Sequence, residues 1–344
     1  MKNTFVSPLV QLAALIIIVA GLMAMQSILL PIIMALFISI ICMQPIIWIT
    51  KKRIPYFLAV TIVLLSMALL FLSFGGIIGN SLAKFTRDLP KYESNLKEMT
   101  LSFITYMNAR GAQINPDQLL KMIDPGKILS FTTGVVGEIG GIMSDSLIIL
   151  FITIFMLLEG KSIAFKARAI EIEHGNPLQY FEVIGSSIRR YLSIKTVVSL
   201  LTGVFIWIWL LVVGVDNAVL WGLIAFLLNY IPNIGSIIAA APTMLLALVQ
   251  LGTGGMVWTG IGYLIVNIVM GSIVEPKVMG RGLGLSTLVV FLSLIVWGFL
   301  FGAVGMFLSV PFTMTIKIIL EKNEKTKWIA VLLGTENETK SILQ

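Results

Sequence analysis

Uncharged apolar stretches make up most of this 344-residue chain and are separated by short charged segments. Asp, Glu, Lys and Arg are absent from six blocks, which are 3–50, 54–83, 146–158, 196–215, 217–274 and 282–316. A membrane-spanning helix needs about 20 mostly apolar residues, whereas spanning strands alternate in polarity, and these blocks show no such alternation. The pattern predicts an all-α, polytopic transmembrane protein.

The block lengths predict where the chain crosses the membrane. We expect about eight crossings, because each needs about 20 residues. The expected helices are 9–25, 31–49, 57–79, 140–158, 196–215 and 256–274, with a broken or re-entrant pair at 218–231 and 234–251 and two passes within 282–316. The first two helices are expected to lead out and back as a hairpin. Gly298, Gly302 and Gly305 would allow a tight turn between the last two passes.

Charged segments divide the chain into five regions. These are three N-terminal transmembrane helices in 1–83, an extramembrane helical subdomain in 84–138, a fourth transmembrane helix with cytoplasmic or interfacial helices in 139–195, a C-terminal transmembrane core with helix breaks in 196–320, and a cytoplasmic tail in 321–344. In the second region, apolar residues recur every three or four positions from Leu82 to Met107, which predicts an amphipathic helix with a boundary at Pro90. We place this region in the periplasm, as a gate or as a packing and oligomerisation element.

The formal net charge is +7, yet only 12% of residues are charged and the mean hydropathy is +0.99. So few polar groups exclude a soluble globular enzyme. Basic residues gather in short loops such as 51–53, which places these loops and both termini on the cytoplasmic side. A helix face near Arg189 and Arg190 favours contact with anionic lipid headgroups. The basic excess therefore indicates orientation and contact with membrane lipid, and we expect no nucleic-acid partner.

Residue types that support metal binding or nucleophilic catalysis are scarce. Cys42 is the only cysteine and His174 is the only histidine in the sequence. Cysteine or histidine metal sites need more of these side chains, and a Ser–His–Asp triad has a single candidate base. We therefore expect no metal, no cofactor and no enzymatic activity. The remaining economical class is a transporter or a channel.

The first of two polar motifs in the C-terminal third is Asn229-Tyr230-Ile231-Pro232-Asn233-Ile234-Gly235-Ser236. Pro232 removes a backbone donor and predicts a helix break. Broken helices carry the substrate sites of many transporters. Asn229, Asn233 and Ser236 would supply neutral donors and acceptors for a polyol or another uncharged solute. Alternatively, these side chains satisfy the freed backbone of a structural kink.

The second motif contains Asn267, Gly271, Glu275, Lys277 and Arg281. Asn267, Gly271 and Glu275 share one helix face at four-residue spacing. Glu275 is expected to pair with Arg281 or Lys277, either as a gate or proton-coupled switch or as an anchor at the membrane interface. An ionisable residue within a membrane segment is a functional hypothesis by default. Asp145, near the outer end of the fourth helix, is a further candidate for gating or coupling.

These motifs resemble those of the autoinducer-2 exporter family of bacterial membrane proteins. The similarity covers nearly the whole chain and is weakest in 84–138; it includes the 51–55 loop, Leu157-Leu158-Glu159, the 191–196 region, Ser286–Leu294, Trp297-Gly298, Val304-Gly305-Met306 and Val310-Pro311. The resemblance implies a multi-pass inner-membrane protein that forms homo-oligomers. It also implies export of autoinducer-2, a small furanosyl signal of quorum sensing.

The leading hypothesis, export of autoinducer-2 or a related small polar metabolite, gives the motif residues distinct roles. Asn229, Asn233, Ser236 and Asn267 would bind the substrate, and Pro232, Glu275, Lys277, Arg281 and Asp145 would act in gating or coupling. Two alternatives remain open. A sodium/proton antiporter would need a titratable intramembrane carboxylate, for which Glu275, Asp145 and Asp216 are the candidates. A membrane scaffold that conducts nothing would use 84–138 and 159–195 to bind partners.

Overall fold

The computed structural model describes residues 8–111, 134, 137, 146–174, 178–232, 234–279 and 284–335. All regular secondary structure in these ranges is helical, as the hydropathy pattern predicted. Five helices there are long and apolar enough to cross a membrane, which are Gln26–Lys51, Tyr56–Ala109, Val183–Val213, Ile234–Met279 and Thr287–Glu321. Shorter apolar helices cover Leu12–Ala24, Ser146–Gly160 and Ala218–Leu228. The protein is an all-α polytopic membrane protein.

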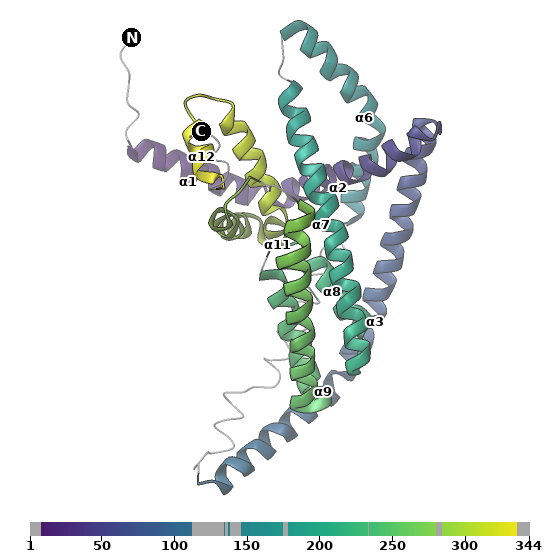
Figure 1. The fold of residues 1–344 in the computed structure, drawn as a ribbon, viewed down its shortest axis with the longest axis vertical. Helices are drawn as coiled ribbons and strands as arrows, with labels where there is room; N and C mark the ends of the chain where they lie inside the picture. Colours follow the sequence, from purple (N-terminus) through teal and green to yellow (C-terminus); the bar gives the residue numbers. More distant parts are fainter. Residues whose placement is uncertain are drawn as a thin grey trace. The chain divides into compact units, whose positions relative to one another are not determined.

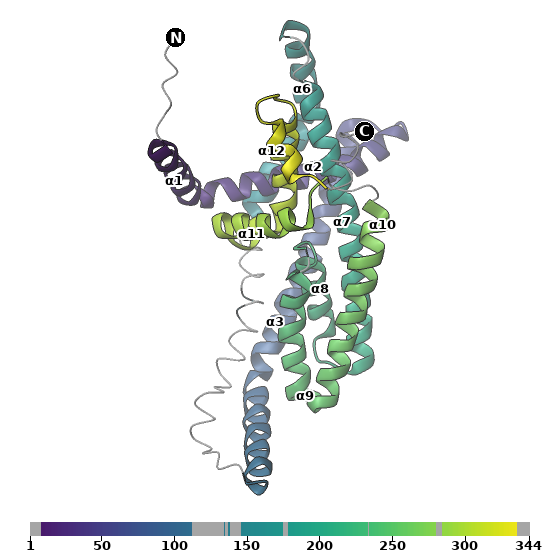
Figure 2. The same ribbon diagram turned by 60° about the vertical axis from the view of Figure 1, so that its left-hand side comes forward.

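The first two helices, α1 (Pro8–Ala24) and α2 (Gln26–Lys51), are separated by Met25 alone. Backbone hydrogen bonds bridge the junction, since the Met25 N–H donates to Gly21 and the Leu29 N–H donates to Met25. In Figures 1 and 2, α2 leads away from α1 instead of lying beside it. The predicted out-and-back hairpin is wrong, because these backbone hydrogen bonds continue across Met25, which has φ −90° and ψ 4° rather than the positive φ of a reversal.

The chain forms two compact units from segments that are far apart in sequence. Unit 1 comprises 1–63, 146–193 and 281–344, and unit 2 comprises 64–145 and 194–280. The helices α3 (Tyr56–Ala109) and α7 (Leu178–Val213) each supply residues to both units. Two of the uncharged blocks found in the sequence therefore belong to different units, with 217–274 in unit 2 and 282–316 in unit 1.

The core of unit 2 forms where the later part of α3 packs with α7, α8 (Ala218–Leu228) and α9 (Ile234–Val266). Trp221 is fully buried there, and its ring meets Phe85 of α3 edge-on, with centroids 6.3 Å apart. The predicted helix boundary at Pro90 is wrong, because α3 runs through it as one 54-residue helix. Phe85 and Tyr92 are buried on either side of the proline and hold both flanking turns in the same core.

The α9 helix is a helical hairpin whose two arms meet at Gly252. This glycine has φ 76° and ψ −167°, a backbone region that is essentially restricted to glycine. Contacts run between the arms, since the Thr243 and Tyr263 hydroxyl oxygens are 3.0 Å apart. The second arm continues into η1 (Asn267–Val274) and α10 (Glu275–Met279). The broken C-terminal helices predicted from the sequence are present in unit 2, and the reversal of α9 is visible in Figure 2.

The α11 helix (Thr287–Glu321) is a second hairpin, and it lies in unit 1. It turns at Gly302, which has φ 62° and ψ −146°. The two arms are held by the Trp297 and Phe312 rings, 4.5 Å apart, and by a 3.0 Å hydrogen bond from Trp297 Nε1 to Thr313. A Cβ at position 305 would lie 1.9 Å from the Trp297 carbonyl oxygen, so only glycine fits. The tight turn predicted from the glycines of this block is confirmed.

Other contacts in unit 1 join α6 (Ser146–His174) to α2 and α12 (Lys327–Leu333) to α11. The Tyr56 hydroxyl donates a 2.7 Å hydrogen bond to the Leu157 carbonyl at the end of the apolar part of α6. The Ser286 N–H donates a 3.1 Å bond to Leu333 of α12, and the Ser286 side chain caps α11. These contacts fix the ends of the unit 1 helices.

Candidate functional site

The break between α8 and α9 is the first element of the site, and it lies at the proline motif. Regular helix stops at Leu228 and resumes at Ile234, with Pro232 in the turn between them. Gly235 makes the turn tight, because a Cβ there would lie 1.8 Å from the Leu228 carbonyl oxygen. The sequence predicted this break from the proline, and the glycine explains how closely the two helix ends approach.

Two side chains at the break reach across to α7. The Asn229 amide donates a 3.0 Å hydrogen bond to the Ser199 hydroxyl, and the Tyr230 hydroxyl donates a 2.8 Å bond to Thr196. Asn229 and Ser199 are both buried. Buried polar groups are normally hydrogen-bonded because an unmet donor or acceptor costs about 1–3 kcal/mol. These bonds therefore hold the break against one polar face of an otherwise apolar helix.

An ion pair joins the same face of α7 to the end of the α9 hairpin. Lys195 Nζ lies 2.7 Å from Oε1 and 2.9 Å from Oε2 of Glu275. The Lys195 side chain is 3% exposed and that of Glu275 is 17% exposed. A lysine this buried is rare without a charged partner, because desolvation of a lone ammonium group is very costly. The pair is thus a charge-neutral unit held at the junction of two helices.

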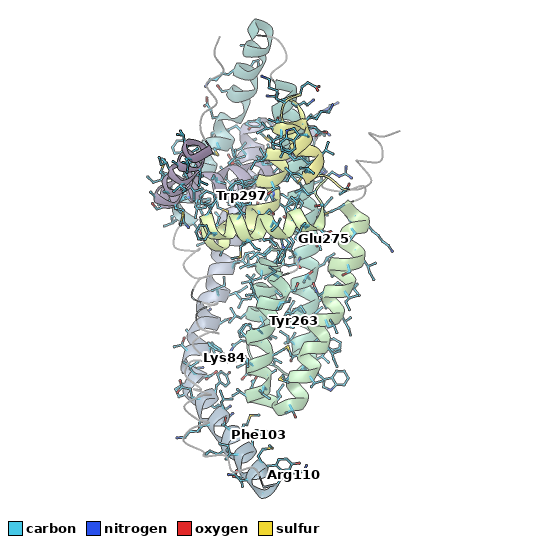
Figure 3. All side chains as sticks on the ribbon, turned by 90° about the vertical axis from the view of Figure 1, so that its left-hand side faces the viewer. Lys84, Phe103, Arg110, Tyr263, Glu275 and Trp297 are labelled. Carbon is cyan, nitrogen blue, oxygen red and sulfur yellow. The ribbon has the colours of Figure 1, made fainter. Side chains whose placement is uncertain are left out.

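The π-helix η1 carries the remaining polar contact. The Ser236 hydroxyl, just after the break, donates a 2.9 Å hydrogen bond to Asn267 Oδ1 at the start of η1. Pro276 offers a reason for the widened turns, because its ring lacks an N–H and crowds the carbonyl four residues earlier. Single π-helical turns inside longer helices often mark functional sites. Figure 3 shows Tyr263 and Glu275 along this arm, on either side of Asn267 in the sequence.

These four polar pairs all lie in unit 2, and together we call them the polar ring. Its members are Lys195, Thr196, Ser199, Asn229, Tyr230, Ser236, Asn267 and Glu275. The ring joins α7, the α8–α9 break and the η1–α10 arm, and its bonds connect residues 30 to 80 positions apart. It offers hydroxyl and amide groups together with a single neutralised charge pair. Such a set suits a small, uncharged solute with several hydroxyl groups, which would exchange partners with these side chains one by one.

The ring contains four of the residues that the sequence predicted for the site, which are Asn229, Ser236, Asn267 and Glu275. Pro232 lies in the α8–α9 break, between Tyr230 and Ser236. The expected partner of Glu275 was Lys277 or Arg281, whereas the structure pairs it with Lys195. Lys277 is exposed. Asn233, Arg281 and Asp145 lie outside the described residues.

Lys195 is the main site residue that sequence reasoning missed. It stands directly before the uncharged block 196–215 and was grouped with the charged segment preceding that block. Its spacing held a signal, since Lys195, Ser199 and Thr202 recur at four and three residues and therefore share a helix face. All three are buried. A polar stripe continuing from a lysine into an apolar helix indicates an inward-facing position for that lysine.

A second polar cluster lies at the C-terminal end of α7. The Tyr92 hydroxyl donates a 3.2 Å bond to Asp216, and the Asp216 N–H donates a 3.0 Å bond to the Gln250 side chain. Asn95 adds a 3.4 Å bond to the Val249 carbonyl. These contacts tie the extension of α3 to the ends of α7 and the first α9 arm. Asp216 is thus engaged in a junction about 27 Å from Lys195 along α7, at about 1.5 Å per residue.

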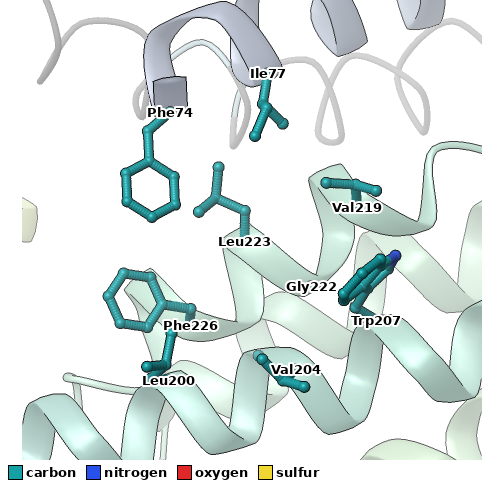
Figure 4. Close-up of a pocket in the computed structure, with 10 residues that line it drawn as sticks. Phe74, Ile77, Leu200, Val204, Trp207, Val219, Gly222, Leu223 and Phe226 are labelled. Carbon is teal, nitrogen blue, oxygen red and sulfur yellow. The ribbon is translucent and has the colours of Figure 1, made fainter. Parts of the chain in front are cut away.

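An apolar cavity of about 130 Å³ lies between α3, α7 and α8 (Figure 4). It is lined by Phe74, Ile77, Leu200, Gly203, Val204, Trp207, Val219, Gly222, Leu223 and Phe226. A polar solute placed there would lose its hydrogen bonds to water and find almost none in return. Gly203 and Gly222 lie where α7 and α8 touch, since a Cβ on Gly203 would sit 2.7 Å from the Gly222 carbonyl. The polar ring is therefore the better candidate for a transport site.

Comparison with known proteins gives consistent results over nearly the whole chain. A family model described as "AI-2E family transporter" matches residues 12–325. A Haemophilus influenzae protein named "Putative transport protein" is 38% identical over 96% of this chain and 97% of its own length. The "AI-2 transport protein TqsA" of Escherichia coli is 37% identical over 96% of both chains. The Escherichia coli protein YhhT is 35% identical over 95% of this chain and 93% of its own.

Proposed function

Because this chain belongs to the AI-2E transporter family, we propose that it exports the quorum-sensing signal autoinducer-2 or a related small polar metabolite. Family membership makes it a membrane transporter of a small-molecule substrate and argues against an enzyme. The name of the relative TqsA, an AI-2 transport protein, supports autoinducer-2 as the solute to test first. The proposal is limited to small, uncharged molecules that are rich in hydroxyl groups, as autoinducer-2 is.

The observation that carries the proposal is the polar ring around the α8–α9 break. Asn229, Ser236 and Asn267 present amide and hydroxyl groups inside an apolar unit. A furanosyl solute with several hydroxyl groups would take over these hydrogen bonds at little net cost, since each exchange replaces one bond by another. The Lys195–Glu275 pair would add charge-assisted hydrogen bonds, which are roughly twice as strong as neutral ones. Its neutrality favours a neutral cargo.

The proposal gives the break and the ion pair distinct roles. Pro232 would let the α8–α9 turn rearrange, because it lacks the backbone N–H that a regular helix uses, and Gly235 would permit the close approach to Leu228 that the turn needs. Separation of Lys195 from Glu275 would open the ring on the α7 side. Lys277, Arg281 and Asp145 remain candidates for gating or coupling outside the ring, and Asn233 remains a candidate ligand at the break.

Flux in proteoliposomes tests the proposal. Purified protein is reconstituted, and the release of autoinducer-2 is compared for wild type, Asn229→Ala, Ser236→Ala and Asn267→Ala. Each substitution should lower flux by about two- to tenfold, the factor expected when one hydrogen bond to the solute is lost. Asn95→Ala and Ser309→Ala serve as matched controls, since Asn95 lies in the other polar cluster and Ser309 bonds within its own helix.

The same vesicles separate the alternatives. Sodium-driven proton movement, followed with a pH-sensitive dye, should be absent if the protein exports a neutral solute without sodium/proton exchange. Sodium-dependent dequenching that Glu275→Gln abolishes would support the antiporter instead. Absence of flux for both solutes, in protein that retains its melting temperature, would favour a scaffold. Unchanged autoinducer-2 flux in Asn233→Ala and Glu275→Gln would remove those residues from the mechanism.

We further propose that the protein resides in the bacterial inner membrane as a homo-oligomer, with both termini in the cytoplasm. The basic 51–53 loop supports a cytoplasmic α2–α3 corner, and the lysines after residue 316 support a cytoplasmic C-terminus. Reporter fusions at the C-terminus, active only in one compartment, test the orientation. Mass measurement of the protein in detergent tests the oligomer, and a monomer that transports at full rate would contradict it.

A further inference from the structure

The corner between α2 and α3 presents three adjacent cations. Lys51, Lys52 and Arg53 are all exposed and follow directly after the apolar helix α2. The corner is well defined, because the Lys52 and Arg53 N–H groups donate 3.0 Å hydrogen bonds to Ile49 and Thr50. The three cations are thus held on a short, ordered turn within unit 1.

Arg53 occupies a backbone conformation that normally belongs to glycine. Its φ is 65°, in the left-handed region, at the position after a helix end where glycine is the usual residue. A long side chain there is strained, and such strain often accompanies function. A glycine would relieve the strain and would remove the third cation. The presence of arginine therefore points to a use for its charge.

Exposed aromatic side chains flank the cations on both sides. Trp48 is 60% exposed and Phe57 is 67% exposed. The Lys52 ammonium lies 3.6 Å from the centre of the Trp48 ring, so it is held by a cation–π contact. Tryptophan is enriched where membrane hydrocarbon gives way to headgroups. The corner therefore combines an apolar surface for acyl chains with cations at headgroup depth.

The described part of the chain supplies no carboxylate to neutralise the corner. Glu159 follows Leu157, which accepts a hydrogen bond from Tyr56 near the corner, but its carboxylate is engaged 2.8 Å from Lys166. Among the described side chains, no ion pair involves Lys51, Lys52 or Arg53. The three charges are therefore open to an anion that binds at the corner.

We propose that the α2–α3 corner is a binding site for the phosphate headgroup of an anionic phospholipid. The occupant is a lipid because the cations sit between Trp48 and Phe57 at the ends of two apolar helices, where bilayer lipid surrounds the chain. The site shares no residue with the polar ring. The proposal therefore does not depend on which solute the protein carries. Arg53 would act as a positioning cation whose strained backbone aims the third charge at the headgroup.

Two Arg53 substitutions, which should weaken lipid binding alike but differ in their effect on stability, test this site. The full chain is purified in detergent, and its affinity for phosphatidylglycerol and for phosphatidylcholine is measured in mixed micelles, together with the melting temperature. Wild type should prefer phosphatidylglycerol. Arg53→Gly and Arg53→Gln should each weaken that binding about fivefold, the factor typical of one cation at an anionic membrane surface. Arg53→Gly should also raise the lipid-free melting temperature, whereas Arg53→Gln should not.

Two controls match the two features of Arg53. Asn217, with φ 55°, also has a left-handed backbone, so Asn217→Gly tests relief of strain alone and should leave lipid affinity unchanged. Arg110 stacks 4.7 Å from the Tyr106 ring outside the apolar stretches, so Arg110→Gln tests loss of a similar cation and should also leave it unchanged. Equal affinity of wild type for the two lipids would overturn the proposal. So would wild-type binding by Arg53→Gln, or equal stabilisation by inorganic phosphate alone.

Discussion

The α9 and α11 hairpins use the same backbone turn but have different contacts between their arms. Each reverses at one glycine with a positive φ, Gly252 in unit 2 and Gly302 in unit 1. Between the arms of α11 lie the Trp297 and Phe312 rings. The α9 arms instead share the Thr243–Tyr263 hydroxyl contact, and the second arm leads to Asn267 and Glu275.

This difference shows that a helix break alone does not identify a transport site. Both hairpins have the glycine that a reversal requires, yet only the α9 arm contributes to the polar ring. In α11, aromatic packing fills the space between the arms and leaves Thr313 to satisfy the Trp297 indole. We therefore expect substitutions at the two turns to act alike on stability, and substitutions between the arms to act differently on transport.

The largest effect is expected where a backbone oxygen fills the space of a side chain. Gly235→Ala and Gly305→Ala would place a Cβ 1.8 Å from the Leu228 oxygen and 1.9 Å from the Trp297 oxygen. Both should lower the free energy of unfolding by about 3 kcal/mol or more, or prevent folding, because backbone must move. Thermal unfolding in detergent measures this. Gly254→Ala is the control, since nothing lies within 4 Å of its Cβ.

The next largest loss of stability is expected in unit 2, when the Lys195–Glu275 ion pair is broken. Glu275→Gln leaves the Lys195 ammonium, 3% exposed, without its counter-ion and should cost about 3 kcal/mol. Lys195→Met leaves Glu275, which is 17% exposed and better hydrated, so its cost should be smaller. The double substitution Lys195→Met with Glu275→Leu should recover part of the loss. The melting temperatures of the three variants measure these costs. A double variant that loses as much stability as the two single variants together would contradict the pairing.

The two turn glycines should then behave as a matched pair. Gly252→Ala and Gly302→Ala each force an L-residue into a conformation that is essentially restricted to glycine, at a cost of about 2 kcal/mol. Neither added Cβ meets an atom closer than 3.9 Å, so strain alone acts. Equal drops in melting temperature would confirm that both turns depend in the same way on a glycine with a positive φ. A drop at one glycine only would show that the two turns are held differently.

The smallest effect separates structure from transport. Trp297→Phe removes the 3.0 Å hydrogen bond to Thr313 and should cost about 1 kcal/mol, with autoinducer-2 flux unchanged. Ser236→Ala removes a bond of similar length to Asn267 and should lower flux as well. Flux and unfolding measured on the same preparations make the comparison. Equal flux in the two variants would remove the distinction between the arms.

Much of the architecture could be predicted from the sequence, because each crossing depends on the local run of apolar residues. The breaks at Pro232, Gly252 and Gly302 were predictable for the same reason, since proline and glycine act on their own backbone. The hairpin of α1 and α2 was wrong because Pro31 was taken as a helix start, although it lies inside α2. Pro90 was similarly overruled by burial of α3 on both sides.

The candidate site was predictable only where its residues are neighbours in the sequence. The polar types at Asn229, Ser236, Asn267 and Glu275 stand out within uncharged blocks. The sequence does not show which residues pair, because Glu275 has Lys277 two residues away and yet pairs with Lys195, 80 positions earlier. Nearby charges in a sequence suggest a pair, but helix geometry directs Lys277 to the surface.

The sequence by itself determined that this chain is a helical membrane protein, where its helices break, and which few polar residues lie near the apolar core. These features follow from the free energy of transferring side chains and backbone into a bilayer, which is set residue by residue. Only the tertiary structure decided that α7, the α8–α9 break and the η1–α10 arm meet in one polar ring. Burial there makes each unpaired group costly, so contact between distant helices, rather than closeness in sequence, selects the partners.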